Sequence, residues 1–387
     1  MKNILFTGHH AELGGGEISL LEIVKNLDKN NFNPLVCLGD KGPLEYEFEK
    51  IGVDVIILKL PGFLRKLNRD PGSSNKISAF IKSTACLPVL TKRFKGIIIE
   101  KNIDVVYINS IKSALYAAIA AKNTKRRIVW QLHDCLTKEF YPTWIIKLVI
   151  MLTHMADQIV CVSDIARQYF IKSGGAATKA VVIYNGIDIK KFNPGVNNGL
   201  KEQLGLSGKK IVSIVGRLEP WKGQEVFINA AGIICGKRDD VSFLIVGGAL
   251  FGFDAYEEKL KKITGSLKLK NKVLFLGFKN DVERIYAASD IITHCSNRPE
   301  PFGRDIIEAM ACAKPVISTA MGAVNEIINN GIDGVIIKPD SPEDLASAII
   351  RLIDNTQAMA VIGKNAAEKA RRLFDIKNLV KSTERLL

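Results

Sequence analysis

The feature that most constrains the fold is a regular alternation of short apolar, β-branched runs with longer segments of helical periodicity. In the first half of the chain the runs are Asn3–Thr7, Pro34–Leu38, Asp54–Leu58, Val105–Asn109, Ile128–Leu132, Gln158–Val162 and Val181–Tyr184. In the second half they are Lys210–Val215, Ser242–Val246, Val273–Leu276, Asp290–His294, Val316–Ser318 and Gly334–Ile337. Short buried strands that alternate with helices predict parallel sheets covered by helices on both faces. We therefore expect an α/β protein with doubly wound parallel sheets.

The chain length and one turn-rich stretch predict two domains. A chain of 387 residues exceeds one ordinary hydrophobic core and suits two domains of about 190 residues each. The stretch Asn193–Gly199 is rich in Asn, Gly and Pro, which is typical of a linker. We expect a first domain over residues 1–193, a second over 200–370, and a C-terminal helix at about 371–387 that packs back on the first. Ligands are expected in the crevice between the domains, at the carboxyl ends of the strands.

The net charge of +14 is concentrated in one segment. Basic residues gather between Lys59 and Lys95, where Asp70 is the sole acidic residue and Phe and Leu side chains are interleaved. Such a segment is a merely solvated face, or it binds an anionic membrane surface or an anionic acceptor. Nucleic acid is the weakest alternative, because no motif for it is visible. Within this segment, Asp70–Asn75 is predicted to be a mobile loop.

The cysteines and the N-terminus indicate a cytoplasmic protein. Seven scattered cysteines include no Cys-x-x-Cys pair, and no secretion signal precedes the first strand, so reduced thiols are expected. The longest apolar run, Trp144–Thr153, is interrupted by Lys147 and is too short to span a bilayer. We expect a cytoplasmic location, with peripheral binding to the inner face of the membrane as the alternative that the basic segment leaves open.

Two glutamates eight residues apart, Glu300 and Glu308, lie in the most informative stretch of the chain. The pattern predicts a strand over Asp290–His294, a Pro/Gly loop, a helix that opens near Gly303, and a second strand from Pro315. A strand–loop–helix unit leaves unpaired N–H groups and a partial positive charge at the helix start, where a phosphate can bind. Ionised carboxylates accept the hydrogen bonds that sugar hydroxyls donate. A sugar joined to phosphates matches this arrangement, although any α/β protein can place one glutamate in a loop and another on a helix.

Two further loops follow the first strand of each expected domain. The loop Gly8–Gly16 ends in three consecutive glycines, followed by a helix expected from Glu17. It is either a flexible turn or a loop that lets the backbone approach a ligand closely. In the second domain, Arg217 and Lys222 lie five residues apart across a Pro-containing turn. At this spacing the planar guanidinium of the Arg and the ammonium of the Lys can both reach one diphosphate, although an isolated Arg and Lys on a loop are usually just solvated.

The stretch from Glu300-Pro-Phe-Gly to Glu308-Ala-Met-Ala-Cys-Ala-Lys-Pro-Val, with Gly216-Arg-Leu and Lys222-Gly, resembles the retaining GT-B glycosyltransferases of family four. The resemblance is clearest from about Ile211 to Ala348 and covers the first domain only loosely. It implies two Rossmann-like domains that face a central cleft. It also implies transfer of a hexose from a nucleotide diphosphate sugar, most often UDP-linked, to an acceptor hydroxyl, such as that of a lipid-linked or cell-surface glycan precursor.

The resemblance implies roles for single residues. Arg217 and Lys222 would bind the donor's phosphates and stabilise the leaving group. Glu300 would bind the donor sugar hydroxyls and Glu308 the ribose of the nucleotide. His133, at the end of the fifth strand, would contact the sugar near its reacting carbon, although a lone histidine is more often structural. The other expected donor contacts are Gly15, Gly16 (where the family usually has Ala), Gly216, Phe278, Pro301, Phe302, Gly303 and Arg304.

No cofactor or metal is expected, because no Cys/His cluster has metal-ligand spacing and the family that the chain resembles does not need the metal-binding Asp-x-Asp of the other large glycosyltransferase class. The resemblance also implies that the departing phosphate accepts the acceptor's proton, so that no protein base is needed. Three alternatives remain open at this point. They are a sugar-nucleotide epimerase of the same fold, a glycoside phosphorylase, and a non-catalytic protein that binds a nucleotide sugar. Turnover of donor with and without an acceptor distinguishes them.

Overall fold

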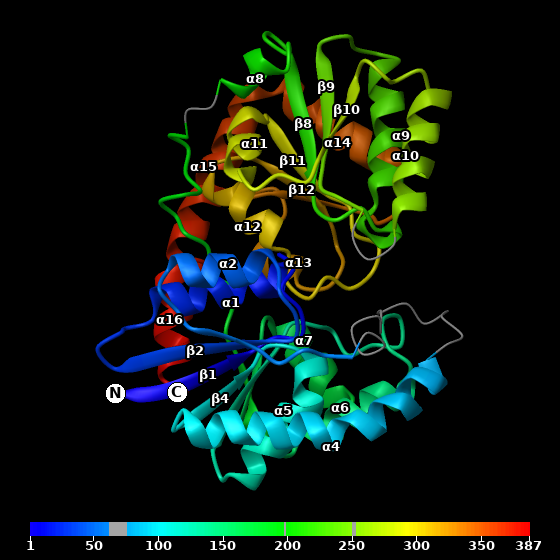
Figure 1. The fold of residues 1–387 in the computed structure, drawn as a ribbon. Helices are drawn as coiled ribbons and strands as arrows, with labels where there is room; N and C mark the ends of the chain where they lie inside the picture. Colours follow the sequence, from blue (N-terminus) through cyan, green and yellow to red (C-terminus); the bar gives the residue numbers. More distant parts are fainter. Residues whose placement is uncertain (62–75, 197–198, 250–252) are drawn as a thin grey trace. The chain divides into compact units, whose positions relative to one another are not determined.

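The computed structural model describes residues 1–61, 76–196, 199–249 and 253–387 (Figure 1). It divides into two compact units, one formed by Met1–Gly186 with Ile376–Leu387 and the other by Ile187–Asp375. The first unit thus ends before the boundary expected at residue 193, and the chain returns to it at Ile376 rather than at about residue 371. The predicted mobile loop Asp70–Asn75 lies outside the described residues.

The first unit contains a seven-stranded parallel sheet in the order β3-β2-β1-β4-β5-β6-β7. Its strands are β1 (Lys2–Thr7), β2 (Phe32–Leu38), β3 (Val55–Ile57), β4 (Val105–Ile108), β5 (Arg127–Leu132), β6 (Gln158–Cys161) and β7 (Ala180–Val182). Figure 1 shows α1 and α2 on one side of this sheet and α4 and α5 on the other. The helices are α1 (Gly15–Asn26), α2 (Pro43–Lys50), α4 (Lys76–Glu100), α5 (Ile111–Asn123), α6 (Thr143–Thr153), α7 (Asp164–Lys172) and α16 (Ile376–Glu384).

The second unit contains a six-stranded parallel sheet in the order β10-β9-β8-β11-β12-β13. Its strands are β8 (Lys210–Val215), β9 (Val241–Val246), β10 (Val273–Gly277), β11 (Ile291–His294), β12 (Val316–Thr319) and β13 (Val335–Ile337). Helices α9 and α10 lie on one side of it and α11 and α12 on the other (Figure 1). The helices are α8 (Leu200–Gln203), α9 (Gln224–Cys235), α10 (Asp254–Ser266), α11 (Val282–Ala288), α12 (Arg304–Ala311), α13 (Val324–Ile327), α14 (Pro342–Asp354) and α15 (Thr356–Leu373), with a short 3-10 helix, η2, at Pro220–Lys222.

Each unit has its own apolar core. The last helix, α16, buries Ile376, Leu379 and Val380 in the core of the first unit, although the chain enters it from the second. Within the described ranges no single helix is both long and apolar enough to cross a membrane, and only the sharply bent pair α14–α15 meets that test jointly.

Every expected strand is present, and its ends agree with the prediction to within two residues. The α/β class and the doubly wound parallel sheets are therefore confirmed. One helix start is corrected. Helix α1 begins at Gly15 rather than at Glu17, because extended Gly14 serves as its N-cap and two of the three glycines enter the first turn.

Candidate functional site

The loops that follow neighbouring strands of the second sheet form a continuous row. The strand order places the segments after β8, β9 and β10 side by side. The amide of Leu218 donates to the carbonyl of Gly248 at 3.1 Å, and the amide of Gly247 donates to the carbonyl of Gly277 at 2.9 Å. The segments containing Arg217, Gly248 and Phe278 therefore lie at one edge of the sheet, its carboxyl edge, where α/β proteins bind ligands.

The loop after β11 carries Glu300, and glycines from two other loops lie in close contact with the backbone of this loop. Gly223 has a φ of 75°, and a Cβ there would lie 2.1 Å from the carbonyl oxygen of Cys295. Gly322 has a φ of 71°, and a Cβ there would lie 2.1 Å from the carbonyl oxygen of Glu300. That oxygen also accepts from the amide of Ala323 at 2.9 Å. Both the left-handed backbone and the close approach require glycine, so the backbone of Glu300 is held in one place.

The side chain of Glu300 is a buried carboxylate paired with Lys222. Its Oε2 lies 2.6 Å from Lys222 Nζ and accepts from the Ser296 hydroxyl at 3.1 Å. The ammonium of Lys222 also lies 4.2 Å from the centre of the Trp221 ring. Burial raises the pKa of Glu300, but the positive charges of Lys222 and His294 outweigh burial and hold that pKa well below its usual range. Glu300 is therefore ionised.

His294, which the sequence reasoning did not select, lies next to Glu300 at the end of β11. It is only 3% exposed. Its Nδ1 is 2.7 Å from Asp305 Oδ2 and its Nε2 is 3.5 Å from Glu300 Oε2. Burial lowers the pKa of His294, but Asp305 and Glu300 outweigh burial and raise it to about 9. The signal was available, because this histidine ends a strand just before the glutamate loop, the same kind of position that selected His133.

Arg217, expected to bind phosphate, lies in the loop after β8 and forms an ion pair of its own. Its guanidinium is 2.7 Å from Glu219 Oε1, and the indole N–H of Trp221 donates to the other oxygen of Glu219. The carbonyl of Arg217 accepts from the side chain of Gln224 at 2.9 Å. Both expected phosphate ligands, Arg217 and Lys222, are thus held by carboxylates at this edge of the sheet.

Glu308 lies on α12 and is held at both carboxylate oxygens. The hydroxyl of Tyr286 donates to Oε2 at 2.9 Å, and Arg304 lies 3.2 Å from Oε1. Burial raises the pKa of Glu308, and Arg304 opposes that effect. Tyr286 is fully buried on α11, and nothing in the local sequence pointed to it as a partner of Glu308. The expected ribose-binding carboxylate therefore has a fixed orientation.

The segment Pro301–Arg304 mixes structural and site residues. Gly303 has a φ of 97° and forms the N-cap of α12, where a Cβ would lie 2.8 Å from Ile306 Cδ1. Phe302 was expected among the donor contacts, but its side chain is buried and packs edge-on against Phe374 at 5.8 Å between ring centres. Its side chain thus belongs to the core, and only its backbone can face a ligand.

Phe278 follows β10, with 52% of its surface exposed. A Cβ on Gly248 would lie 3.6 Å from the Cβ of Phe278, so the two residues are neighbours at the carboxyl edge. An exposed aromatic ring beside a bare backbone offers an apolar face to a planar ligand such as a nucleobase.

In the first unit, the structure brings His133 and Gly16 together. His133 Nε2 lies 2.8 Å from Asn109 Oδ1, and the side-chain Nδ2 of Asn109 donates to the carbonyl of Gly16 at 3.2 Å. A Cβ on Gly16 would lie 3.2 Å from His133 Cδ2. Glycine at this position therefore leaves room for the histidine ring, and Asn109 is a partner that the sequence reasoning missed.

One group in the described ranges could hold a metal ion. Ligand atoms of His9, His10 and Glu17 all lie within 4.8 Å of one another in the first unit. His10 Nε2 is 3.6 Å from Glu17 Oε1, and the ring centres of His9 and His10 are 4.1 Å apart. The expectation that the chain needs no metal therefore stays a prediction.

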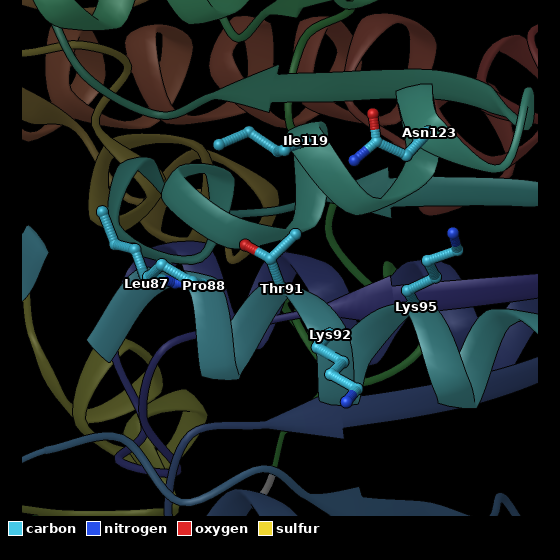
Figure 2. Close-up of a pocket in the computed structure, with 7 residues that line it drawn as sticks. All are labelled: Leu87, Pro88, Thr91, Lys92, Lys95, Ile119 and Asn123. Carbon is cyan, nitrogen blue, oxygen red and sulfur yellow. The ribbon is translucent and has the colours of Figure 1, made fainter. Parts of the chain in front are cut away.

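A cavity of about 470 Å³ lies between α4 and α5 in the first unit (Figure 2). Its lining combines apolar side chains with two lysines: Leu87, Pro88, Thr91, Lys92, Lys95, Ile119 and Asn123. Its lining residues on α4, from Leu87 to Lys95, belong to the basic segment.

Comparison with known proteins matches the chain over both units. The family models "Glycosyltransferase Family 4" and "Glycosyl transferases group 1" match residues 13–191 and 197–369. The structure of HepE from Anabaena in complex with UDP and glucose is 30% identical, with a TM-score of 0.86 over 100% of this chain and 99% of that one. An uncharacterized glycosyltransferase of Methanocaldococcus jannaschii is 27% identical over 100% of this chain and 98% of its own length. The Escherichia coli UDP-Gal:alpha-D-GlcNAc-diphosphoundecaprenol alpha-1,3-galactosyltransferase is 28% identical over 81% of this chain and 83% of its own length.

Proposed function

Because the chain belongs to glycosyltransferase family 4, with the GT-B fold, we propose that it transfers a hexose from a UDP-linked donor to an acceptor hydroxyl with retention of configuration. The observation that carries the proposal is the pair of half-buried Lys222 and buried Glu300, 2.6 Å apart at the carboxyl edge of the second sheet. A nucleotide sugar needs one cation for its diphosphate and one acceptor for its sugar hydroxyls, and this pair supplies both. The complex of HepE with UDP and glucose supports the choice of donor.

Each site residue then has a defined task. Lys222 and Arg217 bind the diphosphate and stabilise the charge that develops on it as the bond to the sugar breaks. Glu300 accepts from the sugar hydroxyls, and Glu308 accepts from the ribose. His133, held by Asn109, contacts the sugar near its reacting carbon.

The proposed transfer needs no protein base. The acceptor oxygen forms a bond to the anomeric carbon as the bond from that carbon to the phosphate oxygen breaks. The acceptor's proton passes to the departing phosphate oxygen on the same face of the sugar, which retains the configuration. The cations at the phosphate lower the free energy of this charge-separated state.

The test of the proposal is release of the nucleotide diphosphate from candidate donors with and without acceptor. UDP-glucose, UDP-galactose and GDP-mannose are incubated with the full chain, alone and with lipid-diphosphate-linked sugars. Acceptor-dependent release of UDP with an α-linked product supports the proposal. Conversion of the donor without acceptor indicates an epimerase, a need for inorganic phosphate indicates a phosphorylase, and binding without turnover indicates a non-catalytic protein.

We expect the Glu308→Ala variant to bind UDP at least about tenfold more weakly, because a hydrogen bond to a charged group contributes about 1.5–3 kcal/mol. Isothermal titration calorimetry with UDP measures this directly. The matched control is Glu368→Ala, which removes a glutamate whose side chain is 63% exposed. An unchanged UDP affinity in Glu308→Ala would remove that residue from the ribose site.

We expect the transfer rate to be the same in excess chelator as in magnesium or manganese. Arg217 and Lys222 provide positive charge where a metal would otherwise neutralise the diphosphate. Complete loss of turnover in chelator, with recovery on adding either metal, would contradict this expectation. The Glu17→Gln variant separates an effect of the His9, His10 and Glu17 group from an effect at the diphosphate.

The acceptor is proposed to be lipid-linked and reached at an anionic membrane surface. Helix α4 exposes Lys92, Arg93 and Lys95, together with Val89 and Ile99, which are 55% and 57% exposed. The cavity between α4 and α5 shares Lys92 and Lys95 with this basic face. The E. coli relative, whose name specifies a diphosphoundecaprenol-linked acceptor, supports the same class of acceptor.

We expect the Lys92→Gln, Arg93→Gln, Lys95→Gln variant to bind anionic vesicles at least about tenfold more weakly than the wild type, because each basic residue near such a surface contributes about 1 kcal/mol. Co-sedimentation with anionic and neutral vesicles measures this, and raising the salt should release the wild type. The control variant changes Lys259, Lys261 and Lys262 to Gln on α10 and removes the same charge. Equal loss of binding in the two variants would mean that net charge, not the α4 face, attracts the protein.

A further inference from the structure

The two groups proposed to bind opposite parts of the donor are bound to each other in the free chain. Lys222 Nζ lies 2.6 Å from Glu300 Oε2, and Lys222 is the shortest contact of that carboxylate. A diphosphate carries more charge than one carboxylate, so a bound donor would draw Lys222 toward itself. Glu300 would then lose its main counter-charge while it remains buried, which is costly for an ionised group.

A second cation is available at the same carboxylate oxygen. His294 Nε2 lies 3.5 Å from Glu300 Oε2, and the Ser296 hydroxyl lies 3.0 Å from that nitrogen and 3.1 Å from that oxygen. The other ring nitrogen of His294 lies 2.7 Å from Asp305 Oδ2 at the start of α12. With a carboxylate at each nitrogen, the imidazole is stabilised in its protonated form.

We propose that protonated His294 is a second counter-charge for Glu300. It keeps this carboxylate ionised and in place when Lys222 moves from Glu300 to the diphosphate of the donor. His294 is thus a positioning residue that acts through Glu300, and Asp305 holds its ring and its proton. The inference rests on the proposed function, because it takes Lys222 to be a phosphate ligand. It adds that donor binding depends on the protonation of a residue that touches no part of the donor.

Donor binding should therefore weaken as His294 loses its proton. The titratable groups that face His294 are Glu300 from the β11–α12 loop and Asp305 from α12, and Lys222 from η2 faces the same carboxylate. The pKa of His294 is raised to about 9, because the two carboxylates outweigh the effect of burial. The group is therefore protonated below that pH and neutral above it, and the loss of affinity is expected as the pH rises through about 9.

The experiment is calorimetric titration of the full-length chain with UDP at about pH 7 and about pH 10. We expect wild-type affinity to fall at least about tenfold between these pH values, and by more than in the His294→Gln variant, which shares any titration of UDP itself. The His294→Gln variant should bind UDP at least about tenfold more weakly at the lower pH and lose most of the pH dependence. In the Asp305→Asn variant, UDP affinity should still fall with rising pH, but the fall should occur at lower pH. This variant provides the test if His294→Gln does not fold.

His154→Gln is the matched control, because it removes an exposed histidine of the first unit. Wild-type affinity and an unshifted pH profile in both His294→Gln and Asp305→Asn would overturn the proposed role of His294. Failure of the wild type to bind UDP at all would instead overturn the proposed function. A merely structural role for His294 would lower the melting temperature without changing the pH profile of UDP affinity, and that result too would overturn the inference.

Discussion

We expect the Glu300→Gln variant to transfer sugar at least about a hundredfold more slowly than the wild type. Glutamine keeps the shape of the side chain, but it removes the charge and replaces one acceptor oxygen by a donor group. One preorganised contact of this kind contributes roughly 3–4 kcal/mol to transition-state stabilisation. The backbone of Glu300 is held by Gly322 and Ala323, so the substitution leaves the loop in place.

The measurement is the initial rate of UDP release with saturating acceptor, with circular dichroism to verify the fold. Glu258→Gln provides the control, because it makes the same chemical change at a side chain that is 65% exposed. A rate in Glu300→Gln close to that of the control would mean that Glu300 does not contact the reacting sugar.

The Lys222→Ala variant should show a loss of similar size, at least about two orders of magnitude, for a different reason. Lys222 is expected to stabilise the charge on the leaving diphosphate, which exists only as the bond to the sugar breaks. The same substitution removes the closest counter-charge of buried Glu300. It should therefore also reduce the free energy of unfolding, because among the described residues buried Glu300 then has only His294 as a nearby positive charge.

A double-mutant cycle separates these two effects of Lys222. Lys222 is expected to act on the phosphate and also through Glu300. The free-energy losses in transition-state stabilisation caused by Lys222→Ala and by Glu300→Gln should then not add in the double variant. Lys259→Ala, at a side chain that is 58% exposed, controls for removal of a lysine. Strictly additive losses, or a rate near that of the control, would show that the ion pair has no part in catalysis.

Local sequence patterns were sufficient to predict the strands and helices of this protein. Each strand is a short apolar run and each helix has its own periodicity, so both are properties of contiguous residues. The places of Glu300 and Glu308 were predictable for the same reason, because a strand, a loop and a helix follow one another directly in the sequence. Only details of the ends failed, such as the start of α1 at Gly15, where glycine gives no side-chain signal for a helix boundary.

Contacts between distant residues decided the chemistry of the site. Lys222 and Glu300 are 78 residues apart, and the order of strands in the sheet, rather than local sequence, brings them to 2.6 Å. Tyr286 reaches Glu308 from another helix, and Asn109 joins Gly16 to His133 across the first sheet. Phe302, expected among the donor contacts, has a buried side chain that packs against Phe374, 72 residues away in the sequence.

By itself, the sequence determined that this chain forms two doubly wound sheets, that Glu300 follows a strand in a loop and Glu308 lies on the next helix, and that Arg217 and Lys222 follow the first strand of the second sheet. The tertiary structure alone decided which charges meet. Burial and close opposite charges shift the pKa values of Glu300 and His294, which lie in one cluster with Lys222. Those effects depend on distances in space. His294, which local sequence did not single out, is therefore a partner of Glu300 only in the folded chain.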